Sequence, residues 1–284
     1  MLKHLAQVLP KRLALLRSGA NGSGNDFNSY MVTAPHRRRL QEELAEIAFA
    51  FCAKNLAAGH AMDVQQVRAI VGEFFEIYPH KPVAHNSGGS GFHNCFWLFV
   101  TAKILNPAVL VESGVWKGQG SWILRQACPQ AAMHCFDLSF RRLVYRDAQI
   151  HYHEMDWENF SFAEINPAQS LCFFDDHVNQ ARRVREAYGK GFRTMLFDDN
   201  APAHKLYGFG LPGVPTIDML CDERCTPGDR IEWVWKGKKR SYLYQREDEY
   251  SAKDLLQHYA VFPDVASVAR YGSHSFLSLV RLVD

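Results

Sequence analysis

The sequence has almost no net charge and no long apolar stretch. Its 284 residues include 32 Lys and Arg against 30 Asp and Glu, which gives a net charge of +2. Binding nucleic acid through a broad cationic face needs a larger basic excess, so we expect no nucleic-acid partner. No apolar run approaches the roughly 20 residues that span a bilayer, so we expect no integral membrane segment. Gly and Pro are too few for a collagen-like or disordered chain.

Disulfide and zinc-finger spacings are also missing. The seven cysteines are an odd number, contain no C-x-x-C pair, and are scattered, several of them in apolar runs. This usage indicates a reducing compartment, and we expect a cytoplasmic protein. The N-terminus carries four Lys or Arg and no acidic residue before Asp26, and it lacks the apolar segment of a secretory signal. An amphipathic basic helix fits it best, and a transit peptide is the alternative.

The first part of the chain is predicted to be helical. Residues 38–58 and 63–78 carry apolar residues at helical spacing, and Asp63 is placed to cap the second segment. A linker rich in Gly, Ser and Asn precedes them over 18–29. We therefore predict an N-terminal helical region over 1–84, followed by a second domain over 85–284.

After Pro107 the pattern changes to short apolar runs that end in acidic residues, with helix-compatible stretches between most of them. The runs recur about every 20 residues, at 108–112, 132–138, 150–156, 170–176 and 193–199. Strand–helix alternation with nearly continuous apolar strands is typical of a parallel sheet covered on both faces. Ligands of such sheets bind beyond the carboxyl ends of the strands, where the strand order reverses. We expect the functional site among these acidic strand ends.

The last third of the chain contains two further signals. Residues 201–250 are rich in Pro and Gly, then aromatic and basic, with Gly237 at a predicted hairpin turn, and we interpret them as an insertion or substrate region. Residues 275–283 predict a final strand. The expected fold is α/β, with a doubly wound, mostly parallel, seven-stranded sheet and an N-terminal helical cap.

A glycine-rich turn follows the first predicted strand, in the sequence ESGVWKGQGS. Glu112 is followed by Gly114 and Gly118, where glycine allows the backbone to approach a ligand and the next helix offers free N–H groups. The glycine spacing is not G-x-G-x-x-G, which argues against a dinucleotide site. Asp137, at the end of the next strand, is placed to accept hydrogen bonds from a ribose diol.

This turn and the acid after the second strand resemble the class I methyltransferases, which bind S-adenosylmethionine (SAM) there. The resemblance covers roughly residues 85–200 and the final strand. It implies a Rossmann-like methyltransferase fold and SAM as cofactor. The implied cofactor-binding residues are Glu112, Gly114, Gly118, Ser121, Asp137 and Asp156.

Paired aspartates end two neighbouring strands, in CFFDDHVNQ and MLFDDNAP. Carboxylates at adjacent strand ends repel one another unless a cation or protons compensate them, and Mg²⁺ prefers oxygen ligands. The motifs are similar to the metal residues of catechol O-methyltransferase and of the macrolide sugar O-methyltransferases related to cephalosporin hydroxylase. This resemblance implies Mg²⁺ or another divalent cation on Asp176, Asp199 and Asn200.

Two alternatives remain for the paired aspartates. If the strand register is shifted by one residue, Asp175 and Asp198 face the site instead. The acids could also be structural, paired with Arg182 or Arg183.

The general base departs from the catechol-type pattern. Those enzymes carry a Lys three residues after the first metal aspartate, and here that position is Asn179. His177 is adjacent to the predicted ligand, and histidine titrates near neutral pH, so we expect it to be the catalytic base.

The sequence therefore predicts a SAM-dependent, metal-assisted O-methyltransferase for a hydroxyl of a polar small molecule, such as a sugar or glycosylated natural product. Two alternatives are a non-catalytic SAM-fold binding protein, favoured by the missing Lys, and a metal-dependent hydrolase that uses the aspartates. The sequence is compatible with a homo-oligomer and does not determine the oligomeric state.

Overall fold

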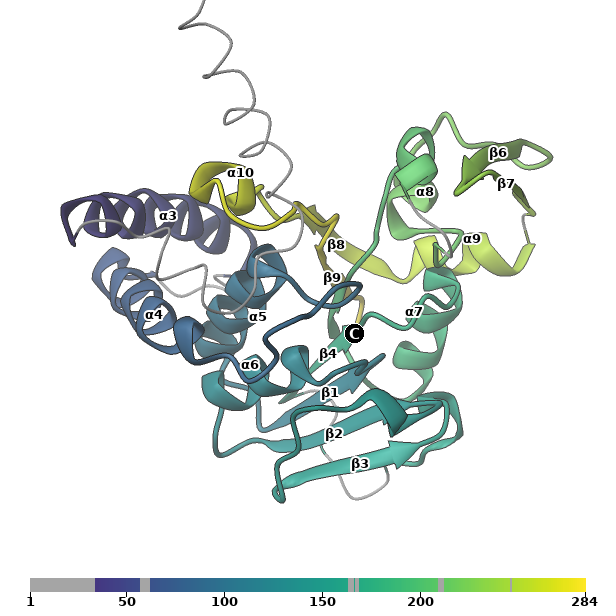
Figure 1. The fold of residues 1–284 in the computed structure, drawn as a ribbon. Coiled ribbons are helices and arrows are strands. Elements are labelled where there is room, and N and C mark those ends of the chain that lie inside the picture. The colour runs from purple at the N-terminus through teal and green to yellow at the C-terminus, as the bar shows by residue number, and fades with distance from the viewer. Residues whose placement is uncertain (1–33, 57–61, 163–165, 167–168, 209–211, 246) are drawn as a thin grey trace, which may run out of the picture. The chain divides into compact units, whose positions relative to one another are not determined.

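The computed structural model describes residues 34–56, 62–162, 166, 169–208, 212–245 and 247–284 (Figure 1). The expected basic N-terminal helix and the linker over 18–29 lie outside the described residues. Contacts group the chain into two compact units that interleave along the sequence. Unit 1 holds the described residues up to 104 with 117–127 and 263–274, and unit 2 holds 105–116, those of 128–262, and 275–284. The boundary between residues 84 and 85 stays a prediction.

Unit 1 is built from helices. In chain order these are α3 (Ala34–Asn55), α4 (Val64–Ile77), η2 (Tyr78–His80), α5 (Phe92–Leu105), α6 (Gln119–Ala127) and α10 (Val265–Ala269). Helices α3 and α4 pack side by side. Asp63 caps α4 by accepting a hydrogen bond from the Gln65 N–H, as predicted. Helix α5 is buried from Phe92 to Ala102, because its apolar residues surround the whole helix.

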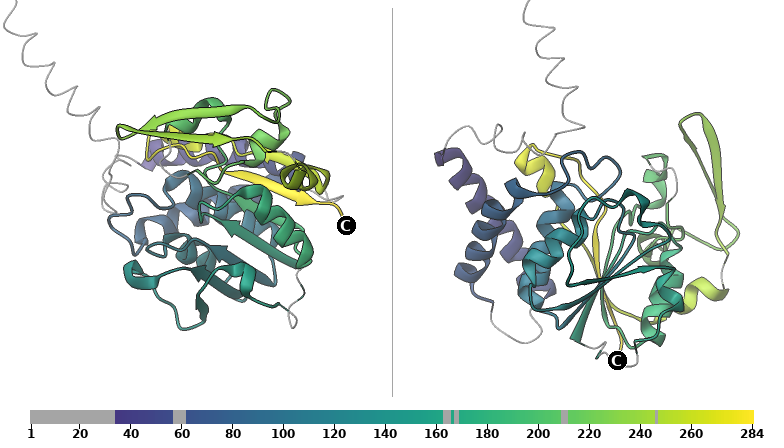
Figure 2. Two further views of the ribbon diagram at one scale, coloured as in Figure 1. Left: turned by 90° about the vertical axis from the view of Figure 1, so that its right-hand side faces the viewer. Right: turned by 60° about the horizontal axis from the view of Figure 1, so that its bottom comes forward.

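Unit 2 contains the predicted seven-stranded sheet, in the order β3-β2-β1-β4-β5-β9-β8 (Figures 1 and 2). Its strands are β1 (Val109–Ser113), β2 (Ala132–Asp137), β3 (Ile150–Glu154), β4 (Ser170–Phe174), β5 (Thr194–Phe197), β8 (Leu256–Val261) and β9 (Ser278–Leu282). Strands β1 to β5 are parallel, and β9 runs antiparallel to both β5 and β8. The strand order reverses between β1 and β4, so the sheet is doubly wound.

Burial explains why the central strands could be predicted and one edge strand could not. All five residues of β1 and of β4 are buried, which is why most of them are apolar; Glu112 and Ser113 of β1 and Ser170 of β4 are the polar exceptions. Strand β8 lies at an edge and carries Gln257 and His258, so its sequence does not stand out from a loop. This strand was missing from the runs identified in the sequence.

The remaining elements of unit 2 are short helices and a hairpin. They are η3 (Phe140–Arg142), η4 (Trp157–Asn159), α7 (Gln180–Gly189), η6 (Ala203–Gly208), α8 (Ile217–Cys221), β6 (Arg230–Trp235), β7 (Lys238–Leu243) and α9 (Glu247–Asp254). Strands β6 and β7 pair antiparallel around Gly237, which confirms the predicted hairpin. Among the described residues, no helix is both long and apolar enough to cross a bilayer.

Three histidines gather on strands β2 and β3. The ring of His134 lies near those of His151 and His153, with centroids 4.9 and 5.3 Å away. Its Nδ1 is 3.1 Å from Nε2 of His153. Burial, and then the two neighbouring histidines, lower the pKa of His134 to about 4. The folded protein therefore holds this ring neutral at pH values where the unfolded chain protonates it.

We expect a His134→Gln variant to lose less stability in acid than the unsubstituted protein. The pKa of His134 in the folded protein lies below the unfolded value of 6.5. The contribution of this histidine to the free energy of unfolding is therefore complete above pH 6.5 and is lost as pH falls toward 4. After allowance for solvent screening, the loss at pH 5 should be about 1 kcal/mol. Urea unfolding of both proteins at pH 8 and pH 5 measures it. An equal stability difference between the two proteins at both pH values would contradict the prediction.

Candidate active site

The turn after β1 passes very close to the end of β4. The N–H of Gly114 donates to the carbonyl of Phe136 at 2.9 Å, and its φ is +90°. A Cβ atom on Gly114 would lie only 2.2 Å from the carbonyl oxygen of Asp175. The approach of two backbones therefore requires glycine at this position, whatever ligand the turn contacts.

Asp137 holds this turn from the end of β2. Its Oδ2 accepts hydrogen bonds from the N–H groups of Val115 and Trp116, at 3.0 and 3.1 Å. Its Oδ1 accepts another from the N–H of Ser139, at 3.0 Å. Because a carboxylate has about four acceptor positions, Asp137 retains capacity for one more donor, such as a ribose hydroxyl.

The other predicted cofactor residues lie in different environments. Glu112 is 1% exposed, and its carboxylate accepts a hydrogen bond from Cys135 Sγ at 3.4 Å. Gly118 precedes α6 with a φ of +87°, and Ser121 is fully buried within α6. The latter two residues belong to unit 1, whereas Glu112 belongs to unit 2.

Asp176 and Asp156 both form ion pairs with the buried side chain of Arg183. The guanidinium of Arg183 is 2.9 Å from Oδ2 of Asp176 and 2.8 Å from Oδ1 of Asp156. Asp176 also accepts hydrogen bonds from Ser113 Oγ at 2.6 Å and from the Val178 N–H at 3.1 Å. This is the structural pairing that the sequence left open as an alternative: Arg183 and Ser113 contact Oδ2 of the predicted metal ligand Asp176, and the Val178 N–H contacts its Oδ1.

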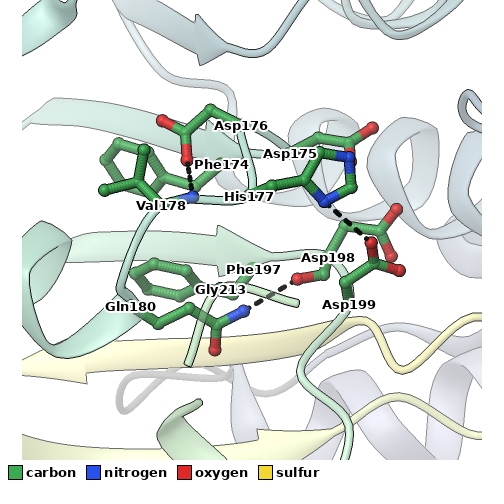
Figure 3. Close-up of a pocket in the computed structure, with 10 residues that line it drawn as sticks. All are labelled: Phe174, Asp175, Asp176, His177, Val178, Gln180, Phe197, Asp198, Asp199 and Gly213. Carbon is green, nitrogen blue, oxygen red and sulfur yellow. Dashed lines mark hydrogen bonds and ion pairs between the residues drawn. The ribbon is translucent and has the colours of Figure 1, made fainter. Parts of the chain in front are cut away.

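Asp175, His177 and Asp199 form a separate cluster (Figure 3). Figure 3 shows these side chains on one side of the two strand ends, with Asp176 directed away from them. One potential ligand atom from each of the three lies within 4.8 Å of the others. They line a pocket of ≈ 10 Å³ together with Asp198. A pocket of this size accommodates about one water-sized sphere.

The electrostatics of this cluster favour a positive charge. Burial, followed by repulsion from Asp198, Asp199 and other nearby carboxylates, raises the pKa of Asp175 well above its ordinary value. A hydrogen bond to Asp199 raises the pKa of His177, and burial opposes this only in part. The two atoms involved, Nδ1 of His177 and Oδ2 of Asp199, are 3.2 Å apart.

Three strand ends of the site carry an unusual backbone conformation. Trp116, His177 and Asp199 follow β1, β4 and β5 and have φ values of +53°, +56° and +51°. A non-glycine residue in this region costs about 1–3 kcal/mol, and such residues concentrate at functional sites. Three further described residues, Asn106, Lys236 and Arg270, share this conformation elsewhere, so the strain supports this edge as the candidate active site only together with the acidic cluster.

Asn200 is not brought to the cluster. Its amide donates to Tyr259 Oη and to Ser278 Oγ, both at 2.9 Å, and accepts a hydrogen bond from the Asp218 N–H at 2.8 Å. At 1% exposure, the side chain is committed to joining the end of β5 to β8 and β9. Asp175, named in the sequence analysis as an alternative, is the acid of β4 that faces Asp199.

Several supporting residues were missed in the sequence. Gln180 donates to the backbone carbonyl of Asp198 at 2.9 Å and accepts a hydrogen bond from the Ile217 N–H at 3.0 Å. Ser275 donates to Asp198 Oδ1, and Ser113 donates to Asp176. Single polar residues of this kind follow no spacing rule, so the sequence offers no signal for them.

Comparisons with known proteins give only distant matches. No family model matches the sequence, and no curated protein matches it. The Podospora anserina methyltransferase PaMTH1, solved with S-adenosylhomocysteine (SAH), is 17% identical, with 86% of this chain and 97% of that chain covered and a TM-score of 0.41. An O-methyltransferase from Bacillus cereus in complex with SAH is 11% identical over 82% and 96%, with a TM-score of 0.40. A CmcI structure described as Mg-SAM is 15% identical over 44% and 63%, with a TM-score of 0.32.

The topology of the sheet carries more weight than these distant matches. The sheet is seven-stranded, mostly parallel and doubly wound, as predicted from the sequence, and the structure adds the strand order β3-β2-β1-β4-β5-β9-β8 with β9 reversed. The acidic strand ends lie beside the point where the order reverses, which is where such sheets bind ligands. By the order and direction of its strands, the chain has the Rossmann-like fold of the class I methyltransferases.

Proposed function

We propose that this protein transfers a methyl group from SAM to a hydroxyl of a polar small molecule, with assistance from a divalent cation such as Mg²⁺. The observation that carries the proposal is the convergence of Asp175, His177 and Asp199 at the carboxyl edge of β4 and β5. The turn held by Asp137 beside the reversal of strand order supports SAM as the cofactor.

The residues present fit a hard divalent cation. Asp175 and Asp199 supply carboxylate oxygens, the ligand type that Mg²⁺ prefers, and their mutual repulsion is relieved by positive charge. When bound, SAM supplies an electrophilic methyl group, and the cation would lower the pKa of the acceptor hydroxyl. Asp176 contributes indirectly, because its contacts with Ser113 and Arg183 hold the end of β4 in place.

His177 is the proposed general base. Its Nδ1 faces Asp199 at 3.2 Å, so a proton on Nδ1 leaves Nε2 as the acceptor for a hydroxyl proton. The side chain is 46% exposed, which leaves it accessible to a substrate. An acceptor with two neighbouring oxygens, as in a sugar or glycosylated natural product, suits a site that combines a base with a cation. The substrate class is therefore part of the proposal.

We expect Asp175→Asn to lower metal-stimulated methyl transfer by about 100-fold or more, because the cation loses a ligand beside the base. Asp176→Asn is the matched control, one residue along the chain but bound to Arg183. It should reduce stability while retaining most of the metal stimulation. Methyl transfer to a panel of sugar and polyol acceptors, with and without EDTA, measures both variants. Calorimetry should show SAM or SAH affinity within a few-fold of the unsubstituted protein.

Three results would overturn the proposal in different ways. Absence of SAM and SAH binding would exclude a methyltransferase. Full activity after EDTA treatment would show that no cation is needed, and His177 would then act as a simple general base. Turnover of phosphate esters without SAM would favour a metal-dependent hydrolase that uses the same carboxylates.

A further inference from the structure

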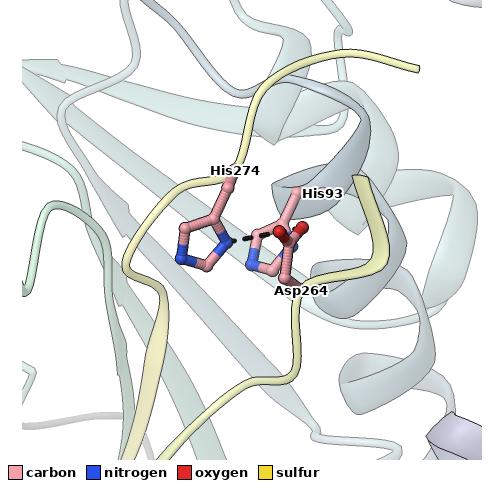
Figure 4. A group of neighbouring side chains, drawn as sticks. All are labelled: His93, Asp264 and His274. Atoms are coloured by element: carbon pink, nitrogen blue, oxygen red, sulfur yellow. Dashed lines mark ion pairs between the residues drawn. The ribbon is translucent and has the colours of Figure 1, made fainter. Parts of the chain in front are cut away.

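A second group of potential metal ligands lies in unit 1 and contains none of the acids at the strand ends. His93 on α5, Asp264 before α10 and His274 after it point toward one another (Figure 4). One ligand atom of each lies within 4.8 Å of the others, and Nδ1 of His274 is 3.6 Å from Oδ1 of Asp264. The rings of His93 and His274 have centroids 5.0 Å apart and are nearly perpendicular, at 78°.

His93 is the unusual member of this group. It is fully buried, and neither ring nitrogen has a hydrogen-bond partner among the described residues. A neutral imidazole carries one donor and one acceptor, and buried groups of this kind are almost always paired. Burial and the neighbouring His274 lower the pKa of His93 to about 3, so the ring is neutral at pH 7. Core packing alone therefore does not account for a histidine at this position.

The other two residues are held in place and remain accessible. Asp264 caps α10, accepting hydrogen bonds from the N–H of Ser267 at 3.1 Å and from its hydroxyl. The indole N–H of Trp97 donates to the carbonyl of Pro263 at 3.0 Å, which fixes the preceding backbone to α5. The side chains of Asp264 and His274 are 32% and 31% exposed, so an ion from solvent can reach them.

We propose that His93, Asp264 and His274 bind a divalent transition-metal ion of the zinc class, with a fourth position for water or an exogenous ligand. Two imidazoles and one carboxylate match the ligand preference of zinc, whereas Mg²⁺ and Ca²⁺ prefer oxygen alone. Tetrahedral zinc with bonds of about 2.0–2.1 Å separates its ligand atoms by about 3.3 Å, close to the observed 3.6 Å between His274 and Asp264. The ion would join the 263–274 segment to α5. This site shares no residue with the proposed methyltransferase site.

The test uses the full chain without an affinity tag and Co²⁺ as a spectroscopic probe. We expect one Co²⁺ per chain with the intense visible absorption of four-coordinate cobalt, displaced by Zn²⁺. His274→Ala and Asp264→Asn should weaken this binding at least tenfold, and Asn at position 264 still caps α10. His85→Ala, which removes another exposed histidine of unit 1, is the control and should bind as the unsubstituted protein does.

The outcomes separate this site from the acidic cluster and from the free cysteines. A weak six-coordinate spectrum alone, lost in Asp199→Asn but retained in His274→Ala, would place the metal at the acidic cluster and overturn the proposal. A cobalt–thiolate absorption would indicate cysteine ligands and would also overturn it. The proposal is also overturned if both site variants bind Co²⁺ as tightly as the His85→Ala control.

Discussion

Replacing Gly114 with alanine is expected to destabilise the protein by about 3–5 kcal/mol or to prevent folding. The new Cβ would lie 2.2 Å from the carbonyl oxygen and 2.4 Å from the carbonyl carbon of Asp175. Both atoms belong to backbone that is tied to β1, because the N–H of Asp175 donates to the carbonyl of Ser113 at 2.8 Å. The clash therefore cannot be relieved by turning a flexible side chain.

Gly228→Ala is a matched control for this prediction. Gly228 has a φ of +89°, almost identical to the +90° of Gly114, but a Cβ atom there has no neighbour within 4 Å. This variant carries only the left-handed backbone strain and should lose about 1–2 kcal/mol. Urea unfolding of the two variants separates the clash from the strain. If both variants lose the same free energy, the close approach between the β1 turn and β4 is not what requires glycine.

Arg183→Met is expected to lower the free energy of unfolding by about 3–5 kcal/mol. The side chain of Arg183 is only 2% exposed and lies within 3.0 Å of three carboxylates, those of Asp156, Asp176 and Glu186. Methionine has a similar length but no charge, so all three acids lose the Arg183 guanidinium, although Glu186 keeps its ion pair with Arg182. The neighbouring Arg182→Met is the control, since Arg182 is 41% exposed and its ion pairs should contribute about 1 kcal/mol or less.

The effect of Arg183→Met should also depend on pH. Burial acts to raise the pKa of Asp156, but hydrogen bonds from Arg183 and from the Glu158 N–H outweigh it and hold the pKa below 3.8. The stabilisation from the Asp156–Arg183 pair is therefore complete above the pKa of Asp156 in the unfolded chain. It is lost as pH falls through the lower pKa of Asp156 in the folded protein. The stability difference between the unsubstituted protein and the variant should shrink between pH 7 and pH 3. A difference that stays constant over this range would show that Arg183 acts by packing alone.

The arginine also explains which aspartates can serve the proposed cation. Arg183 compensates the charge of Asp176, so that acid forms part of the scaffold. Among the described residues, no lysine or arginine pairs with Asp175, which faces Asp199 and His177 instead. In the proposed site, Arg183 of α7 thus separates a structural Asp176 from an Asp175 that would hold the cation.

The residue types at the site and their position in the fold could be predicted from the sequence. Strands that are buried on both faces are mostly apolar, as β1 and β4 are, and the acids Glu112 and Asp175 lie at or just after the end of these runs. Parallel strands with helical connections place these ends at one edge, and the observed register, which sets Phe174 opposite Phe197, puts the ends of β4 and β5 side by side. The cap at Asp63 and the hairpin at Gly237 could also be predicted, because each depends only on residues that are close in sequence.

The orientation of individual side chains was decided only by tertiary structure. Neighbouring acids at a strand end point to opposite sides, and the pattern of the strand does not say which one meets a cation. Asn200 bonds to Tyr259 and Ser278, which lie 59 and 78 residues away in the chain, so its amide is tied to β8 and β9. His93 meets Asp264 and His274 across an even longer separation in the chain. Local sequence thus determined where each strand ends, whereas the partners of these polar groups depend on contacts that exist only once distant segments have packed together.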